Sequence, residues 1–572
     1  MKLRSFFYAL AAGVSVLLLT SIAGFFWLTA QSPVKLLRGG AITNPSAAIF
    51  VPKQAPIVAS LLVNPERLEN FRQVVALPVN RRRSRNELKQ LEASLFAKQG
   101  IDYRRDIRPW LGDEITVAVT SLDFDRNPDN SAQPGYLLAA TTKNPQRAKE
   151  FLQLFYSKQS TAGTPDLVFE QYKGVNLIYK RPETPEKSSR GLPETLTGAL
   201  VGDRFVLFAN HPKVMREAIN NVQVANLSLN DDPVYQQKLE TLTEPRIGLS
   251  FVNLPALAAW VSKQPASGND ALKGSETLAV ALSLNRLGLL AQTALVSSQP
   301  SSETLEPTLK QPVAALQYIP NHSLLALAGT DLKQFWNRLS TGTESNETLK
   351  PLIENAIASL QSRWDLDLPE AIFSWVQGEY AISALPRPDK TDPDWIFVAQ
   401  KTPEANAQEA IEHLDTLAKQ RGLSVGTLPL ADKTITAWTK LVTSSTTVAG
   451  KDKMMRLEAQ VAGCHATVGD YEIFTSSIEA MSEALQGSEN SLVKNDNFKE
   501  AIAALPTPND GYLYLDWLNG QQLVNSQLPI VQVAELVAKP LFDHLRSLSI
   551  SSYGINQGVQ RSQLFFRLDN RN

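Results

Sequence analysis

The chain has 572 residues, of which 56 are basic and 57 acidic, so its net charge of −1 gives no overall attraction to nucleic acid or to an anionic membrane. This length exceeds one ordinary hydrophobic core and indicates several domains. The single cysteine, Cys464, excludes an intramolecular disulfide and a cysteine-rich metal site.

The first element in chain order is the uncharged stretch 5–30, "SFFYALAAGVSVLLLTSIAGFFWLTA". Roughly 26 helical residues span about 39 Å, enough to cross a hydrocarbon core of about 30 Å. A cleaved signal peptide is the alternative, but its apolar core is usually shorter, and Leu28 stands where a small residue should precede cleavage after Ala30. We therefore expect residues 5–30 to be an uncleaved membrane anchor and assign residues 1–45 to this anchor and a short linker.

The charges on either side of this stretch predict its orientation. Lys2 and Arg4 lie closer to the apolar residues than Lys35 and Arg38 do. Because positive charge favours the cytoplasmic side, we expect the N-terminus in the cytoplasm and the bulk of the chain on the periplasmic or lumenal side.

Two stretches far apart in the chain nearly repeat each other: "ALVGDRFVLFANHPKVMREAI", 199–219, and "ATVGDYEIFTSSIEAMSEAL", 466–485. Further matches keep the same order in both halves of the chain: Pro52 with Pro320, Trp110 with Trp375, Pro134 with Pro393, Pro233 with Asp496, and Gly288 with Gly558. We predict a tandem duplication. The two halves are residues 46–297 and 311–572, joined by a linker rich in Ser, Pro and Thr at 298–310.

Within each half, short apolar runs are separated by turn residues such as Gly202-Asp203 and Gly469-Asp470, and amphipathic helices lie between them. Hairpins require antiparallel pairing. The predicted fold class is α+β: two tandem homologous lobes behind one transmembrane helix, each an antiparallel sheet with helices packed on one face.

A search for chemistry finds no G-x-S-x-G nucleophile elbow, no H-E-x-x-H, no phosphate-binding loop and no dinucleotide fingerprint. We expect no cofactor and no enzymatic activity. Cys464 and His465 are adjacent, but neighbours on a strand point to opposite faces, so we expect a buried thiol beside a surface imidazole rather than a metal site.

The best metal candidate is "DFDRNPDN", 123–130, in which Asp123, Asp125 and Asn127 have the spacing of a calcium loop. The pattern then fails, because Pro128 stands where the loop needs Gly and Pro134 stands where a bidentate Glu belongs. We interpret these residues as a solvated turn and weak metal candidates.

The densest charge run is "RRRSR", made of Arg81, Arg82, Arg83 and Arg85 around one serine. It could contact anionic lipid headgroups or an acidic partner, and the alternative is a solvated loop. No nucleic-acid module or interleaved aromatic pattern accompanies it, so no nucleic-acid partner is expected.

The anchor, the "FVP" opening at 50–52 and the block 201–219 together resemble a bacterial family of membrane-anchored proteins, common in cyanobacteria and catalogued as domain of unknown function 3352. The resemblance covers most of the chain after the anchor. It implies a plasma-membrane or thylakoid location, and it carries no catalytic residues and no activity.

These observations favour a membrane-tethered, non-enzymatic scaffold or binding protein with a protein partner in the envelope or thylakoid. One alternative is a carrier or chaperone for lipid or another hydrophobic ligand, which needs a deep apolar pocket enclosed by a sheet. A hydrolase with a noncanonical site is a third, and it needs a polar cleft with perturbed pKa values.

Overall fold

The computed structural model describes residues 43–63, 102–127, 132–161, 167–180, 196–242, 244–257, 277–296, 306–334, 368–387, 393–403, 406–448, 452–527, 539–556 and 558–568. The expected anchor at 5–30 and the arginine run at 81–85 lie outside these residues. Within them, no helix has the length and apolar character needed to span a membrane.

The described strands form one 20-stranded sheet in which every pairing is antiparallel. The first ten strands are β1 (Ile57–Leu61), β2 (Leu111–Ser121), β3 (Gly135–Thr142), β4 (Leu167–Tyr172), β5 (Val175–Lys180), β6 (Thr197–Val201), β7 (Phe205–Ala209), β8 (Gly248–Asn253), β9 (Thr277–Asn285) and β10 (Gly288–Val296). The second ten are β11 (Leu325–Thr330), β12 (Glu379–Leu385), β13 (Asp394–Gln400), β14 (Ser424–Leu430), β15 (Lys433–Val448), β16 (Asp452–Val468), β17 (Tyr471–Thr475), β18 (Tyr512–Asp516), β19 (Leu545–Asn556) and β20 (Val559–Leu568).

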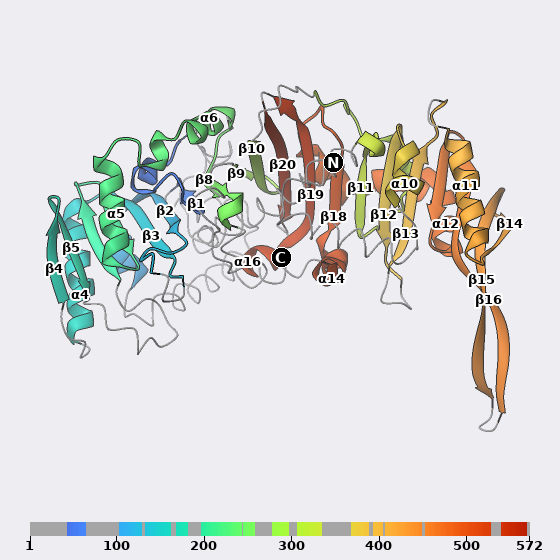
Figure 1. Cartoon of the computed structure of the whole chain (residues 1–572), viewed down its shortest axis with the longest axis horizontal. Coiled ribbons are helices and arrows are strands. Elements are labelled where there is room, and N and C mark those ends of the chain that lie inside the picture. Colours follow the sequence, from blue (N-terminus) through green and yellow to red (C-terminus); the bar gives the residue numbers. More distant parts are fainter. Residues whose placement is uncertain are drawn as a thin grey trace, which may run out of the picture.

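The order of strands across the sheet reads the same from either end. From one edge it runs β4-β5-β6-β7-β3-β2-β1-β8-β9-β10, and it continues as β20-β19-β18-β11-β12-β13-β17-β16-β15-β14. Each pairing among β1–β10 therefore has a counterpart between the strands numbered ten higher. The result is an elongated, arched molecule (Figure 1).

The middle of this order is the antiparallel pair β10–β20, which we call the seam. It runs from Gly288 opposite Arg567 to Val296 opposite Val559, and Gln292 faces Gln563 at its centre. Each glutamine is the fifth residue of its own strand. The seam therefore has a local twofold symmetry, in which corresponding strands pair about corresponding residues. This symmetry matches Gly288, the first residue of β10, with Val559, the first residue of β20. The sequence comparison matched Gly288 with Gly558, which is one residue earlier.

Helices cover both faces of the sheet. Alternate residues of one strand point to opposite faces, and they pack there into different cores. The helices with described bounds are α4 (Pro145–Thr161), α5 (Pro212–Gln223), α6 (Pro233–Thr241), α10 (Leu368–Ala371), α11 (Ala407–Gln420), α12 (Ile478–Leu485), α13 (Asp496–Ala503), α14 (Trp517–Gln527) and α16 (Lys539–Phe542). On β7, Val206 packs with Phe155 of α4, whereas Leu207 packs with Met215 of α5. The α+β class is confirmed, but the expectation of helices on only one face is wrong.

Local sequence signals place these helices. The first turn of α5 begins at Pro212, and the His211 Nδ1 accepts a hydrogen bond from the Lys213 N–H at 3.1 Å. The corresponding helix α12 is capped by Ser477, whose Oγ accepts from the Ala480 N–H at 3.1 Å. A short polar cap followed by an apolar stripe is the usual signature of a helix that lies on a sheet.

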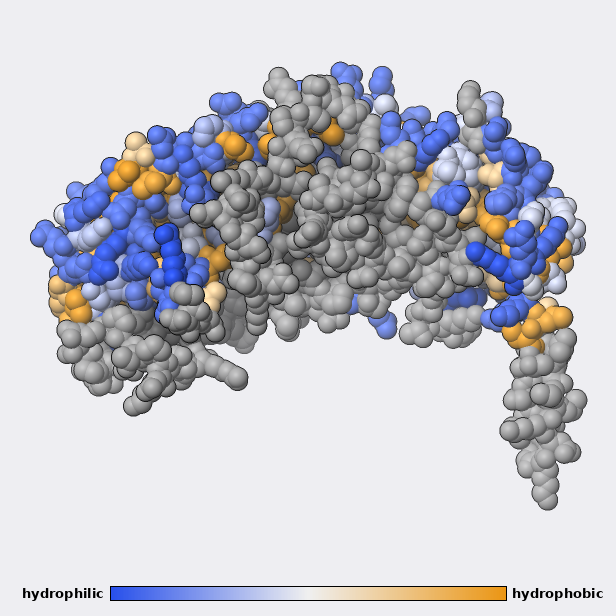
Figure 2. Space-filling model, in the orientation of Figure 1, coloured by the Kyte–Doolittle hydropathy of each residue, from blue (hydrophilic) through white to orange (hydrophobic). Residues whose placement is uncertain are grey.

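One hairpin leaves the body of the molecule. Strands β15 and β16 stay paired to Val448 and Asp452 at the far end, while the pairing of their outer neighbours stops earlier: β14 pairs with β15 only as far as Thr439, and β17 pairs with β16 only from Cys464 onward. The paired segments Lys440–Val448 and Asp452–Gln460, called here the projecting hairpin, extend away from the arch (Figure 1). The described surface is mostly hydrophilic, and apolar residues gather at the base of this hairpin (Figure 2), where Leu428 and Leu441 are exposed.

Candidate functional site

The base of the projecting hairpin holds the densest buried polar cluster on β16. The register jumps from Trp438 opposite Gly463 to Thr439 opposite Val461, so one residue of β16 bulges out of the ladder. A Cβ on Gly463 would lie 3.0 Å from the Trp438 ring, so any larger residue here would have to push this ring aside. Because bulges bend a strand, this one sets the direction in which the hairpin leaves the sheet.

Two residues beyond Gly463, the His465 ring lies between two carboxylates. Its Nδ1 is 2.6 Å from Glu472 Oε1 on β17, and its Nε2 is 3.2 Å from Asp415 Oδ1 on α11. His465 is 6% exposed, so the expectation of a surface imidazole is wrong. The signal for the two carboxylates was absent from the sequence, because they lie 7 and 50 residues away from the histidine.

Both carboxylates have further partners. The Thr467 hydroxyl donates to Glu472 Oε2 at 2.6 Å, and the Lys401 Nζ lies 3.8 Å from the same oxygen. The Trp438 Nε1–H donates to Asp415 Oδ1 at 2.7 Å. The buried negative charge is therefore shared among hydrogen-bond donors and a lysine, as a buried charge requires.

Aromatic rings enclose the imidazole. The Phe474 ring stacks on His465 with ring centroids 5.5 Å apart, and the Trp438 ring lies tilted at 5.6 Å. Burial alone would lower the pKa of His465, but the hydrogen bond and charge of Glu472, together with those of Asp415, outweigh burial and raise the pKa above its ordinary value. The protonated ring is thus the form that this site favours.

This geometry joins three elements rather than presenting a reactive group. Both ring nitrogens of His465 face carboxylates, so neither faces a hydroxyl or thiol nucleophile, as a hydrolytic triad would require. The adjacent Cys464 thiol faces Thr475 Oγ1 at 3.0 Å on the other side of the strand, and burial raises its pKa to about 11. A thiol with so high a pKa is a poor nucleophile.

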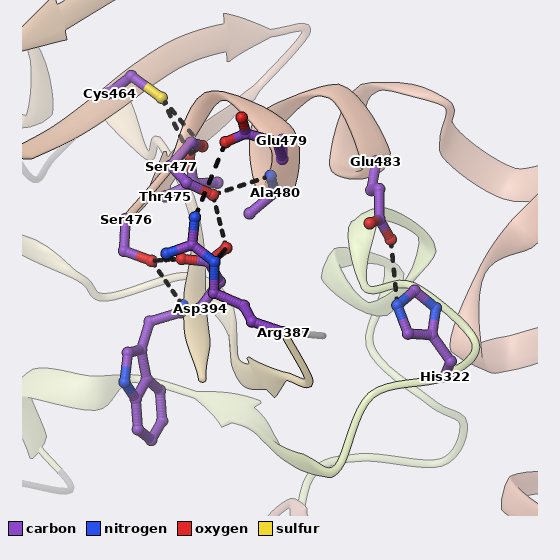
Figure 3. A network of polar contacts seen from close by, with 11 residues as sticks. His322, Arg387, Asp394, Cys464, Thr475, Ser476, Ser477, Glu479, Ala480 and Glu483 are labelled. Atoms are coloured by element: carbon purple, nitrogen blue, oxygen red, sulfur yellow. Dashed lines mark hydrogen bonds and ion pairs between the residues drawn. The ribbon is translucent and has the colours of Figure 1, made fainter. Parts of the chain in front are cut away.

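A second network lies on the opposite face of the same strands (Figure 3). The buried Asp394 carboxylate accepts the hydroxyls of Ser476 and Ser477, each at 2.7 Å, and pairs with Arg387 Nε at 2.8 Å. Ser477 also caps α12, so this network anchors the helix that follows the β16–β17 hairpin. His322 and Glu483 form a separate pair at 3.3 Å between an exposed loop and the same helix.

The sequence-predicted metal candidates behave as turn residues. Asp123 Oδ1 accepts the Gln133 N–H at 3.2 Å, and Asp125 Oδ1 accepts the Asn127 N–H at 3.1 Å. Within the described ranges, no group of three or more His, Cys, Asp or Glu is close enough to hold a metal ion. The arginine run 81–85 lies outside the described residues, so its anionic contacts stay a prediction.

Two glutamates at matching places in the halves were missed by sequence reasoning. Glu114 on β2 accepts the backbone N–H groups of Ser46 and Ala47 at 2.9 and 2.8 Å, at the start of the 3₁₀ helix Ser46–Phe50. Glu379 on β12 accepts from the Ala315 N–H at 3.2 Å in the 3₁₀ helix Ala314–Tyr318. Each follows a glycine shortly after the matched tryptophan, a signal that the sequence does contain.

Lys238 on α6 is a buried amine with no hydrogen-bond partner for its Nζ. Burial lowers its pKa to about 7, and its Nζ lies 4.9 Å from the centre of the Phe251 ring. With no second polar group aimed at it among the described side chains, it defines no binding site.

Comparisons with known proteins add one strong match. A family model described as "Protein of unknown function (DUF3352)" matches residues 10–568. No curated protein matches the sequence. Crystal forms I and III of the protein TP0453 are similar at 10% and 9% identity over 46% of this chain and 82% and 83% of theirs, with a TM-score of 0.23. A TM-score this low does not establish a shared fold.

Proposed function

We propose, from the premise that this chain belongs to the DUF3352 family of proteins of unknown function, that it is a membrane-tethered, non-enzymatic scaffold that binds a protein partner. The observation that carries the proposal is the arched, continuous sheet with one described hairpin held clear of it. The continuous sheet supplies a stiff support, and the buried cluster around His465 fixes the hairpin at its base. Binding elements presented on rigid supports lose less entropy when they bind.

The proposal includes a duplicated body. We propose that residues 46–297 and 311–572 are homologous lobes, joined by 298–310. The strand pairings support this origin, because each pairing in the first ten strands recurs ten strands later. The matched tryptophans support it as well: the Trp110 Nε1–H donates to Asp106 O and the Trp375 Nε1–H to Ala371 O, each four residues earlier in the chain.

The tether is the uncharged stretch 5–30, with the body on the periplasmic or lumenal side of a plasma or thylakoid membrane. Its support is the length and lack of charge of that stretch. Membranes washed with alkaline carbonate should retain the full chain. Recovery of a shorter chain in the wash, lacking its first residues, would instead support a cleaved signal peptide.

A scaffold is favoured over a lipid carrier because apolar cores pack against both faces of the described sheet near its centre. The core on one face includes Leu278 and Val280, and the core on the other includes Ala279 and Ala281. A carrier would need a sheet that curves around an apolar space instead.

The test removes the hairpin and leaves its base intact. In the shortened variant, Lys440 is joined to Gln460 through a two-residue Asn-Gly turn, which keeps Trp438, Gly463 and His465. In a deletion strain, the parent chain should complement and crosslink to a defined partner, and the shortened chain should do neither while its melting temperature stays the same.

An enzyme would respond differently to substitution. Alanine at Asp394, Asp415 or Glu472 should lower the melting temperature in proportion to any loss of function, because each carboxylate is structural. If one such substitution abolishes complementation and leaves melting unchanged, the scaffold proposal is wrong and a catalytic site should replace it.

A further inference from the structure

The projecting hairpin has two bare edges. Within the described part of the chain, no strand pairs with the outer side of Lys440–Val448 or with the outer side of Asp452–Gln460. The free part of β15 is nine residues, which is about 30 Å at the strand rise of about 3.3 Å per residue. A row of unpaired backbone N–H and C=O groups of this length is a template for another strand.

The two edges differ in charge. The outer edge of β15 reads "KLVTSSTTV" from Lys440 to Val448, with its one charge at the base of the hairpin, no proline and no bulge. The other edge, on β16, carries Asp452, Lys453, Arg456 and Glu458. Charged side chains on an edge oppose pairing with another copy, so β16 is protected and β15 is not.

The terminal strand of the described sheet, β14, has an outer edge that is protected against pairing with another strand. Strand β14 contains Gly426 and Pro429 within seven residues, and proline cannot donate to a strand ladder. The contrast with β15 is therefore a difference between neighbouring strands of one sheet, and it points to pairing at β15 alone.

The molecule itself contains an antiparallel pairing of two corresponding strands. At the seam, β10 and β20 are corresponding strands that pair antiparallel about Gln292 and Gln563. The same arrangement can form between two copies of one strand, because an antiparallel pair about a twofold axis presents identical surfaces to each other.

We propose that β15 pairs antiparallel with β15 of a second copy of this chain, centred on Ser444, so that two hairpins form a four-stranded sheet between two molecules. In this register Ser444 faces Ser444 of the other copy, Thr443 faces Ser445, and Leu441 faces Thr447. No like charges meet among these pairs. A two-stranded ribbon is marginally stable by itself, and pairing provides the additional strands it lacks. The hairpin extends clear of the arch, so a second hairpin can lie along it (Figure 1).

The first experiment uses the full chain in its native membrane and single cysteines at 442, 443, 444, 445 and 446. Ser444→Cys should form a disulfide-linked dimer under mild oxidation, because the twofold axis sets position 444 beside itself, and the other positions should crosslink less. Cys464 is buried, so the parent chain should not crosslink. Thr427→Cys, exposed on the protected strand β14, is the matched control and should stay monomeric.

The second experiment uses charge and the full chain purified in mild detergent. Thr443→Lys with Ser445→Lys sets like charges opposite each other across the axis and should yield a monomer by light scattering. Thr443→Lys with Ser445→Glu sets opposite charges there and should restore the dimer. Melting temperatures should agree among all three chains. Each residue lies on the projecting hairpin, outside the packed body.

The proposal is overturned if the parent chain is a monomer at tens of micromolar and Ser444→Cys crosslinks no more than Thr427→Cys. It is equally overturned if both charge variants dimerise alike. These outcomes concern copies of this chain only, so the proposal can fail while the proposed binding of a different protein stands, and the reverse also holds.

Discussion

At the scale of single residues, the imidazole of His465 is a positive charge held between two negative ones. Glu472 lies against one ring nitrogen, Asp415 lies against the other, and Lys401 lies beyond Glu472. The neutral ring can donate to only one of the two carboxylates, so loss of its proton leaves the other carboxylate without a donor. The contribution of this site to stability therefore depends on protonation.

We expect His465→Gln to lower stability by about 3 kcal/mol at acidic pH, the low end for breaking a buried charge pair. The folded pKa of His465 is raised, so the stabilisation is fully present below the unfolded pKa of about 6.5 and is lost as pH rises through the folded value. The difference in melting temperature between parent and variant should therefore shrink from pH 6 to pH 9. A constant difference would mean that the ring is neutral throughout.

His211 provides the matched control. Burial lowers its pKa, and its ring stacks on Phe124 with centroids 4.5 Å apart. The pH dependence of stability therefore has the opposite sign. The stabilising contribution of His211 is present above its unfolded pKa and is lost as pH falls through its folded pKa. The difference between parent and His211→Gln should thus grow as pH rises toward about 6.5 and stay level above it, where the His465 difference shrinks.

Alanine variants of the matched tryptophans and of the turn aspartates should differ in how much stability they lose, because the tryptophans are packed in the core and the aspartates only shape turns. Trp110 and Trp375 are each at most 4% exposed, so either one replaced by alanine should lose about 3–5 kcal/mol. Asp203 and Asp470 are exposed in turns, so their alanine variants should stay within about 0.5 kcal/mol of the parent. Chemical denaturation measures all four, and similar losses for both pairs would contradict this assignment.

At the scale of elements, the sequence predicted most hairpins and helices. Turn residues at Gly202 and Gly469 and caps before Pro212 mark strand and helix ends within a few positions. What it could not predict depends on contacts between distant residues. The alternation on β7 does not reveal that a helix covers each face, and nothing near His465 in sequence announces Asp415, because α11 reaches the site only after folding.

The length of β15 and β16 was missed for a related reason. The segment 433–468 reads as polar residues mixed with β-branched ones, and no gap in this pattern marks where neighbouring strands end. Sequence patterns report which residues favour a strand, but the presence of a neighbour depends on where β14 and β17 stop.

The bulge at the hairpin base offers a test at this scale. Gly463→Val should clash with the Trp438 ring, disturb the Trp438–Asp415 hydrogen bond and change the intrinsic tryptophan fluorescence. Gly426→Val on β14 is the control, because a Cβ there meets nothing within 4 Å and valine favours strands. The first variant should lose roughly 1–3 kcal/mol and the second almost nothing. Equal effects would show that the bulge does not depend on glycine.

At the scale of the whole molecule, one continuous sheet should unfold as one unit only while the seam is intact. Thr293 lies in the seam, is buried, and donates from Oγ1 to the Ser562 carbonyl at 3.2 Å. Thr293→Pro removes both this bond and a ladder position, since proline is disfavoured inside a sheet. Calorimetry should then resolve two transitions, one for each half, where the parent chain has one.

Thr427→Pro is the control for this prediction. It lies on β14 two residues before Pro429, so its backbone nitrogen points the same way as one that is already a proline. This variant should keep a single transition. If it splits the transition as Thr293→Pro does, the seam is not the joint between the halves.

The position of β20 bears on how the chain is made. It is the last described strand to leave the ribosome, yet it lies in the middle of the sheet, between β10 and β19. Until β20 is made, the completed first half must wait with β10 uncovered on that side, and every chain that stops before Val559 keeps that edge bare. Losing residues 559–568 therefore removes the central strand of the described sheet, so these ten residues decide whether the two halves become one body.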